Sequence, residues 1–181
     1  LNTLIYVTSA TSLGIVLTIL ASYVLSRKGL MWGGTLTFLI AFTMLFDGGL
    51  FSTYIVVKNL NLIDNPLAVI LPKCISVFNV MIMRTAFRDI PDGLEEAARI
   101  DGAGAVRTLI SIILPVSKAI IAVVVLFYAV YHWNSWFNAS IYLKDRNLYP
   151  LQLLLREIVV QNQTPALEDM GEPSAMNLSR M

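Results

Sequence analysis

The feature that most constrains the fold is a set of long apolar runs that carry almost no charge. The first run, residues 1–26, contains no charged side chain and stops at Arg27 and Lys28. A hydrocarbon core about 30 Å thick requires roughly 20 apolar residues of helix. Because backbone polar groups find no partners in lipid, a run of this length must be helical there. Residues 1–26 therefore predict a membrane-spanning helix.

Three further runs predict three further spans. Residues 30–46 are uncharged, residues 66–83 contain only Lys73, and residues 119–143 contain no formal charge and one histidine, His132. Across the chain, 56% of residues are hydrophobic and 14% are charged, whereas soluble domains average about 45–50% and about 25%. We therefore expect an all-α, polytopic transmembrane bundle with about four spans. Residues 51–63 suit a helix at the membrane interface, and residues 148–160 an amphipathic helix.

Charge and cysteine content exclude several classes of function. The net charge of +1 provides no basic field for nucleic acid. The single cysteine, Cys74, excludes an intramolecular disulfide, and no metal site is expected. Cys74 itself is expected to be an inert small hydrophobe. The sequence also contains no phosphate-binding glycine loop and no nucleophile-elbow or His-Glu-x-x-His pattern, so we expect neither an ATPase nor another catalytic site in this chain.

The distribution of lysine and arginine predicts the orientation of the spans. Loops on the cytoplasmic side of a membrane carry the excess of these residues. One side of the four predicted spans has seven and the other has five. The seven are Arg27, Lys28, Arg84, Arg88, Arg99, Arg107 and Lys118. Residues 84–118 are therefore predicted to be cytoplasmic, and residues 47–65 and 144–181 to face outward.

The loop between the third and fourth runs has a distinctive pattern. It reads Glu96-Ala97-Ala98, three residues, Gly102, nine residues, and Ile112-Ile113-Leu114-Pro115. Asp92 and Glu95 suit a capping box at the start of a helix, and Glu95 and Arg99 have the spacing of an ion pair along it. Gly102 and Gly104 offer positions of positive φ that end this helix. A second helix should follow, ended or kinked by Pro115.

This pattern resembles the EAA loop of permease subunits of ATP-binding-cassette (ABC) importers. Residues 2–6, 25–27 and 83–85 are similar to carbohydrate permeases of the maltose-transporter type. The segment from Phe127 to Asn138, followed by Tyr149-Pro150-Leu151-Gln152, resembles a branch that handles oligosaccharides, including aldouronate-type fragments. The resemblance covers nearly the whole chain up to about Gln163. It implies a permease subunit of a carbohydrate importer that forms the translocation path in a bacterial plasma (inner) membrane.

The resemblance also implies partners and coupling residues. Two ATPase subunits would bind ATP and magnesium, so this chain needs no cofactor. A second permease would complete the path, and an extracytoplasmic solute-binding protein would deliver the carbohydrate. Family members typically have six spans, so we expect a fragment: a permease domain over residues 1–163, and an extracytoplasmic loop or truncated end over 164–181. The residues expected to couple to the ATPase are Glu95, Glu96, Ala97, Ala98, Asp101, Gly102 and Pro115.

Aromatic and amide side chains near the outer end of the last span are candidates for the substrate path. Aromatic faces stack on sugar rings, and amides hydrogen-bond hydroxyl groups. Asn134 and Asn138 are four residues apart and would share one helix face. The tryptophans would equally suit an interfacial belt. The candidates are Trp133, Asn134, Trp136, Phe137 and Asn138.

Three polar residues within the spans have alternative roles. Lys73 is expected to snorkel outward or to pair within the bundle, and Asn79 to hydrogen-bond between helices. His132 is expected to make a structural hydrogen bond. An alternative hypothesis is an intramembrane enzyme in which His132 takes part in catalysis. Two alternatives to a carbohydrate importer remain. One is an importer of peptide or phosphodiester, and the other is a structural membrane anchor.

Overall fold

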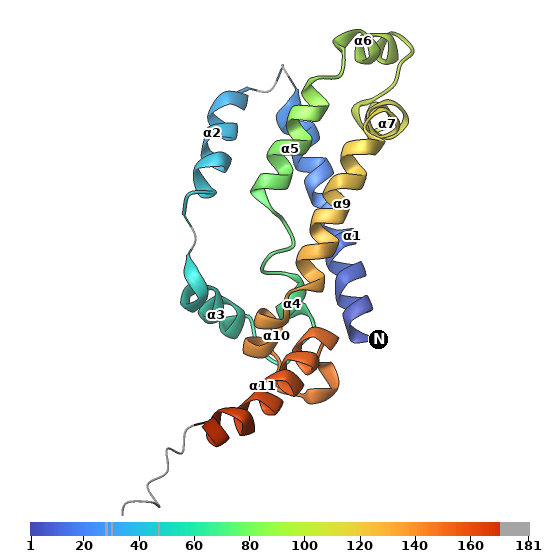
Figure 1. Ribbon diagram of the computed structural model, residues 1–181. Helices are drawn as coiled ribbons and strands as arrows, with labels where there is room; N and C mark the ends of the chain where they lie inside the picture. The colour runs from blue at the N-terminus through green and yellow to red at the C-terminus, as the bar shows by residue number, and fades with distance from the viewer. Residues whose placement is uncertain (28, 30, 47, 171–181) are drawn as a thin grey trace, which may run out of the picture.

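The computed structural model describes residues 1–27, 29, 31–46 and 48–170, with side chains described up to residue 161 (Figure 1). Within this part the regular structure is entirely helical. The helices are α1 (Asn2–Ser26), α2 (Gly33–Thr43), α3 (Gly49–Asn59), α4 (Leu67–Ile70), α5 (Val77–Arg88), α6 (Asp92–Ile100), α7 (Ala105–Thr108), α8 (Leu114–Val116), α9 (Lys118–Trp133), α10 (Trp136–Tyr142) and α11 (Leu151–Met170). A π-helical segment, Leu109–Ile113, joins α7 to α8, and a 3-10 turn, Arg146–Leu148, precedes α11.

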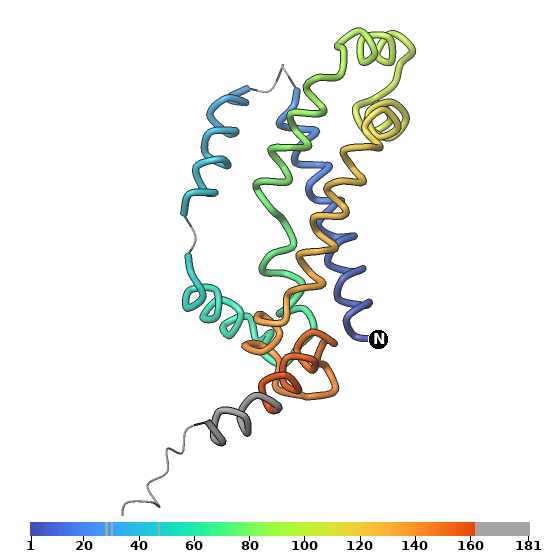
Figure 2. The backbone as a smooth tube through the Cα atoms, in the orientation of Figure 1, coloured from blue at the N-terminus to red at the C-terminus, as the bar shows by residue number. Residues whose placement is uncertain are grey.

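Three long helices form the centre of the molecule. α1 packs along both α5 and α9, and the tube view shows the three running side by side (Figure 2). Buried side chains fill the half of this bundle nearest α6, with Met83 and Phe87 from α5 packed against Val124 and Tyr128 from α9. At the opposite end, α10 and α11 pack around α4 and the start of α1. The bundle therefore has two distinct ends joined by α1, α5 and α9.

The first predicted span is confirmed as one continuous helix, α1. By length and apolar composition α1 qualifies to cross a membrane. The segment Ala105–Val116 and α9 would together count as a second membrane-spanning helix, although their axes are 85° apart. The run 30–46 forms only the short apolar helix α2, and Leu30 and Asp47 at its margins lie outside the described residues.

The prediction of one continuous helix over 66–83 is wrong. The chain forms α4, leaves the helix over residues 71–76, and resumes as α5. Pro72 explains the interruption because proline donates no backbone hydrogen bond and restricts the residue before it. The run 119–143 is also interrupted, since α9 ends at Trp133 and α10 begins at Trp136.

Three predictions outside the spans have mixed outcomes. The interfacial segment 51–63 lies mostly in α3, and the amphipathic segment 148–160 mostly in α11, so both are confirmed as helices. The segment 164–181, expected to be an extracytoplasmic loop or a truncated end, begins within α11, which continues to Met170. The remainder of that segment, residues 171–181, lies outside the described residues.

Candidate functional site: a coupling loop and a membrane cavity

Helix α6 and its glycine elbow form a projection at one end of the bundle (Figure 1). Gly102 has φ of +76°, as predicted. The Gly102 N–H donates to the Arg99 carbonyl at 3.0 Å, and the Ala103 N–H donates to the Ala98 carbonyl at 2.8 Å. These two bonds are a Schellman motif, which satisfies the last carbonyls of the helix and turns the chain sharply. The elbow therefore follows directly from the glycine in the motif.

Two finer predictions about this loop are wrong. Gly104 has φ of −73°, an ordinary extended value, so it ends no helix. Pro91, not Asp92, occupies the N-cap position, and the α6 start has no side-chain cap. Proline at 91 fixes the φ angle just before the helix, which moves Asp92 and Glu95 into the first turn. There the acidic side chains still face the positive end of the helix dipole.

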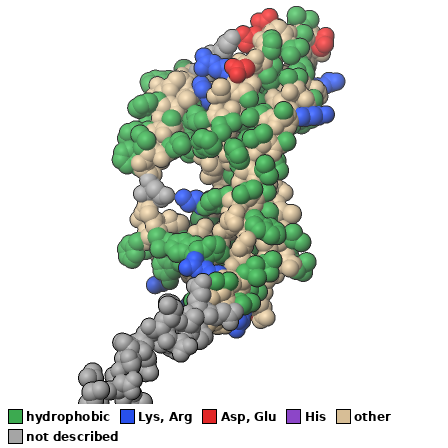
Figure 3. Space-filling view, in the orientation of Figure 1, with side chains coloured by type: hydrophobic (Ala, Val, Ile, Leu, Met, Phe, Trp, Pro, Cys, Tyr) green, Lys and Arg blue, Asp and Glu red, His purple; other side chains and the backbone are tan. Residues whose placement is uncertain are grey.

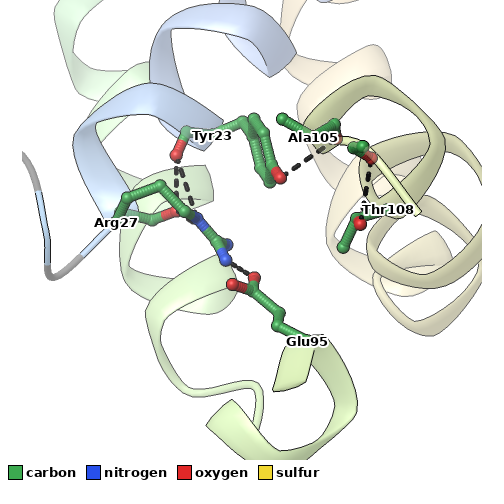
Figure 4. Close-up of polar contacts among 7 residues, drawn as sticks. Tyr23, Arg27, Glu95, Ala105 and Thr108 are labelled. Carbon is green, nitrogen blue, oxygen red and sulfur yellow. Dashed lines mark hydrogen bonds and ion pairs between the residues drawn. The ribbon is translucent and has the colours of Figure 1, made fainter. Parts of the chain in front are cut away.

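The last turn of α1 and Arg27, the residue that follows it, hold this loop on both sides of the elbow (Figure 4). Arg27 forms an ion pair with Glu95 of α6, with 21% and 17% of the two side chains exposed. The Tyr23 hydroxyl donates to the carbonyl of Ala105, where α7 begins, at 3.1 Å. The Arg27 guanidinium also lies 4.4 Å from the centre of the Tyr23 ring, a cation–π contact. The sequence did not predict this partner for Glu95.

Arg27 stays charged although its surroundings disfavour the charge. Burial lowers the pKa of the Arg27 guanidinium from its ordinary value, and the positive charge of Arg99 lowers this pKa further. The Tyr23 hydroxyl and the Asp92 carboxylate act in the opposite direction. Because the ordinary pKa of arginine lies far above physiological pH, the side chain stays protonated there. An ion pair this poorly exposed is screened by salt less than a surface pair.

The predicted coupling residues divide between two faces of the loop. Glu96, Ala97 and Asp101 are exposed, and so are the apolar neighbours Leu94 and Ile100, the latter at 86%. Glu95 and Ala98 instead face the bundle. A hollow of about 580 Å³ lies between this loop and the ends of α1 and α5. The outward face of α6 is therefore a small mixed surface of apolar and acidic side chains.

Pro115 lies beside the sharpest bend of the chain. Residues 105–116 and α9 meet at Ser117 with an angle of 85° between their axes. Proline cannot donate the helical hydrogen bond at this position, and the preceding π-helical turn already displaces the bonding pattern. The predicted kink is therefore confirmed, and it directs α7 across the end of the bundle instead of along it.

The aromatic and amide candidates for the substrate path are less concentrated than the sequence suggests. The helix break at residues 134 and 135 removes the shared face expected of Asn134 and Asn138. Trp136 packs on the cluster formed by α1, α4, α10 and α11, and the Arg156 guanidinium lies 3.5 Å from the centre of its ring. Trp133 and Phe137 are 40% and 50% exposed.

A larger cavity, which the sequence did not predict, lies between the chain at the end of α2, at Thr43, Met44, Phe46 and Gly48, and the α5–α9 pair. Its volume is about 930 Å³, and the molecule is visibly hollowed there (Figure 3). Aromatic side chains from α5 and α9 line it, and the non-helical segment 71–76 forms part of its wall. The lining includes Lys73, Ser76, Phe78, Asn79, Phe127 and Tyr131. Pro72, which breaks the helix here, was the available signal for this site.

The remaining polar residues of the predicted spans have different surroundings. Lys73 is exposed, and Asn79 is buried at the cavity wall. His132 is buried, stacked at 6.4 Å on the Tyr128 ring and edge-on to Tyr131. Cys74 is a half-buried free thiol. Within the described residues no three His, Cys, Asp or Glu side chains are grouped to hold a metal ion.

Comparison with known proteins identifies the family. A family model described as "Binding-protein-dependent transport system inner membrane component" matches residues 2–165. The polygalacturonan/rhamnogalacturonan transport system permease protein YtcP of Bacillus subtilis (strain 168) is 45% identical over 150 residues, which cover 83% of this chain and 52% of YtcP. Protein LplC of the same organism is 39% identical over 156 residues, covering 86% of this chain and 53% of LplC.

A solved structure agrees with the sequence relatives. A bacterial ABC transporter involved in the import of the acidic polysaccharide alginate contains a chain that superimposes with a TM-score of 0.85. The two chains share 30% sequence identity, over 88% of this chain and 57% of the other. The chain thus spans about half the length of the curated relatives it matches. From its helical fold, its coupling-loop motif and these matches, the chain belongs to the family of inner-membrane components of binding-protein-dependent transport systems.

Proposed function

We propose that this chain forms part of the translocation path of an ATP-driven importer for oligosaccharides released from acidic polysaccharides. The observation that carries this proposal is the 45% identity to a polygalacturonan/rhamnogalacturonan permease over 83% of this chain. The transporter whose chain shares this fold is also involved in the import of an acidic polysaccharide, alginate. The aromatic cavity is consistent with such a cargo, because aromatic faces stack on sugar rings.

The arrangement of the loop supports a division of the coupling residues into two roles. Exposed Glu96, Ala97 and Asp101 would contact an ATPase subunit bound from the cytoplasm, together with Leu94 and Ile100. A short helix seated in a groove of its partner is displaced as a rigid body when the partner moves. Gly102 would keep the elbow fixed during that displacement, and Pro115 would keep α7 across the bundle. ATP and magnesium would bind to the ATPase.

The orientation and the remaining partners belong to the same proposal. The end of the bundle with α6 would face the cytoplasm, in agreement with the lysine and arginine distribution. The permease domain would comprise residues 1–163 of a polytopic protein in the bacterial inner membrane. The opposite end, with α3, α10 and α11, would face an extracytoplasmic solute-binding protein. A second permease subunit would close the path alongside this one, and two ATPase subunits would drive the pair.

Reconstituted transport tests this proposal. The full-length protein would be assembled with its partner permease, ATPase and binding protein in proteoliposomes. We expect ATP-dependent uptake of radiolabelled trigalacturonate, and less uptake of a tripeptide or of a glycerophosphodiester. Uptake of one of these other solutes in place of the trisaccharide would show that the importer carries a different substrate. Solute turnover in vesicles that lack the ATPase would favour an intramembrane enzyme instead.

A further inference from the structure

The last turn of α1 makes contacts on both sides of the coupling elbow. Arg27 pairs with Glu95 before Gly102, and Tyr23 bonds to the carbonyl of Ala105 after it (Figure 4). Ala98 is the one buried side chain of α6, so apolar packing contributes little to holding α6 against the bundle. Displacement of α6 would therefore act on α1 directly, besides acting through the chain connections to α5 and α7.

The same turn of α1 is also fixed to α5. The Arg84 side chain donates from Nε to the carbonyl of Leu25 at 3.0 Å. The Ser22 hydroxyl donates to the Val80 carbonyl at 3.0 Å, and Ser22 is fully buried. These contacts leave the end of α1 little freedom to move independently of the loop and of α5.

The first turns of α1 make a matching set of contacts at the opposite end. The Tyr6 hydroxyl donates to the Leu148 carbonyl at 2.8 Å. The Leu151 N–H donates to the Thr3 hydroxyl at 2.8 Å, and the Asn2 side-chain amide donates to the Asn147 carbonyl. Three polar side chains of α1 thus hold the segment that leads into α11.

An unbroken helix connects these two sets of contacts. α1 has 25 residues, which at 1.5 Å per residue is a length of about 37 Å. The neighbouring chain segments are interrupted at residues 71–76, at Ser117 and at residues 134–135. α1 is therefore the stiffest connection between the coupling loop and the far end.

We propose that α1 is a transmission rod, which Arg27 and Tyr23 clamp to the coupling loop so that displacement of α6 moves the segment 147–151 at the opposite end. Arg27 and Tyr23 are positioning residues, since neither belongs to the exposed face of α6. This inference rests on the proposed importer function, because an ATPase must displace α6. It assigns the outer segment 147–151 a response to ATP that does not depend on the identity of the cargo.

Covalent replacement of the ion pair tests the clamp. In the full-length assembled transporter with Cys74→Ser, Arg27→Cys and Glu95→Cys would be combined and joined by a flexible bis-methanethiosulfonate reagent. A fluorophore attached at residue 147 through a non-cysteine label would report movement of the outer segment on ATP addition. Before crosslinking we expect the ATP-dependent signal and solute uptake to fall about tenfold, within the usual range for coupling between sites. After crosslinking both should recover, and a reducing agent should abolish them again.

Recovery of the ATP-dependent signal after crosslinking distinguishes a role of the ion pair in coupling from a role in folding. A pair needed only for folding or insertion would not regain its signal when it is rejoined in protein that is already inserted. Lys118→Gln, which removes an exposed cation from the same end, should leave the signal at the level of the unaltered transporter. An unaltered signal in the uncrosslinked pair, or an efficient crosslink without recovery, would overturn the clamp. A normal ATP-dependent signal without uptake of any tested oligosaccharide would instead overturn the proposed cargo and leave the clamp standing.

Discussion

Gly14 in the middle of α1 is the position where the packing of the bundle is most easily tested. A Cβ atom on this residue would lie 2.5 Å from the carbonyl oxygen of Cys74 and 3.2 Å from the Tyr128 ring. The first distance is far below van der Waals contact, and the atom involved belongs to the backbone. Gly14→Ala must therefore displace the segment 71–76 away from α1. Small residues permit such close approach of helices in membranes.

The magnitude follows from three contributions. Overpacking of a tight site costs about 1–3 kcal/mol. Movement of the segment also weakens the bond from the Ser76 N–H to the Tyr128 hydroxyl, at 2.9 Å. The added methyl group also presses on the Tyr128 ring, which weakens the bond of this hydroxyl to Thr18, at 2.7 Å. Leaving a buried donor unpaired costs about 1–3 kcal/mol. The better helix propensity of alanine returns about 1 kcal/mol. The net loss is about 3 kcal/mol, or roughly 6–12 °C in melting temperature for a chain of this size.

The assay is thermal unfolding of the full-length protein in detergent, followed by tryptophan fluorescence. Gly34→Ala is the matched control, because Gly34 also lies in an apolar helix but has nothing within 4 Å of an added Cβ. We expect the control to melt at or slightly above the temperature of the unaltered protein. If Gly14→Ala melted together with Gly34→Ala, the close approach of α1 to the segment 71–76 would be refuted.

Three further predictions concern other parts of the molecule. Tyr128→Phe removes the hydroxyl that accepts a hydrogen bond from the Ser76 N–H, and should lower the free energy of unfolding by about 1–3 kcal/mol in the same melting assay. Its control is Tyr131→Phe, at the exposed cavity wall, which should leave the melting temperature unchanged. Glu96→Lys reverses a charge on the exposed face of α6 and should reduce ATP-driven uptake about tenfold with normal membrane insertion; unchanged uptake would remove Glu96 from the docking surface. The Asp64 carboxylate accepts hydrogen bonds from the backbone N–H groups of Asp145 and Lys144, and these bonds lower its pKa. The stability that they contribute is therefore fully present above the pKa of about 4 that the carboxyl has in the unfolded chain. It is lost as the pH falls through the lower pKa of the folded protein. Protection of these two amides from hydrogen exchange should therefore decrease only in acid, and protection unchanged by Asp64→Ala at neutral pH would contradict the link.

The sequence predicted best where a single residue type controls the backbone. Gly102 produced the elbow and Pro115 the bend, because each restricts the chain locally whatever surrounds it. The uncharged run 1–26 produced α1 for a similar reason, since nothing within it interrupts a helix. Pro72 carried the same kind of information about the run 66–83, but apolar content alone suggested a continuous helix there.

The packing face of α1 also had a signal in the sequence. Its apolar residues surround the helix, so hydrophobic periodicity could not orient it. Small residues recur every four positions along α1, and this stripe is the buried face. The stripe is Ala10, Gly14, Thr18, Ser22 and Ser26. The contact of Arg27 with Glu95 carried no comparable signal, because it joins segments far apart in the chain whose relative placement depends on the whole bundle.

The interruption at residues 71–76 connects the packing of α1 to the cavity. Non-helical backbone at membrane depth is tolerated where it lines a cavity, and this segment lines one. Gly14 admits the Cys74 carbonyl on one side, and Ser76 lines the cavity on the other, with its N–H paired to Tyr128 of α9. If α1 moved as a rigid body, its contacts at Gly14 and with Tyr128 would therefore transmit the movement to the cavity wall. The helix itself would not have to bend. In the proposed function, a rigid helix beside an interrupted one would let movement at the loop 84–118 alter the shape of this cavity.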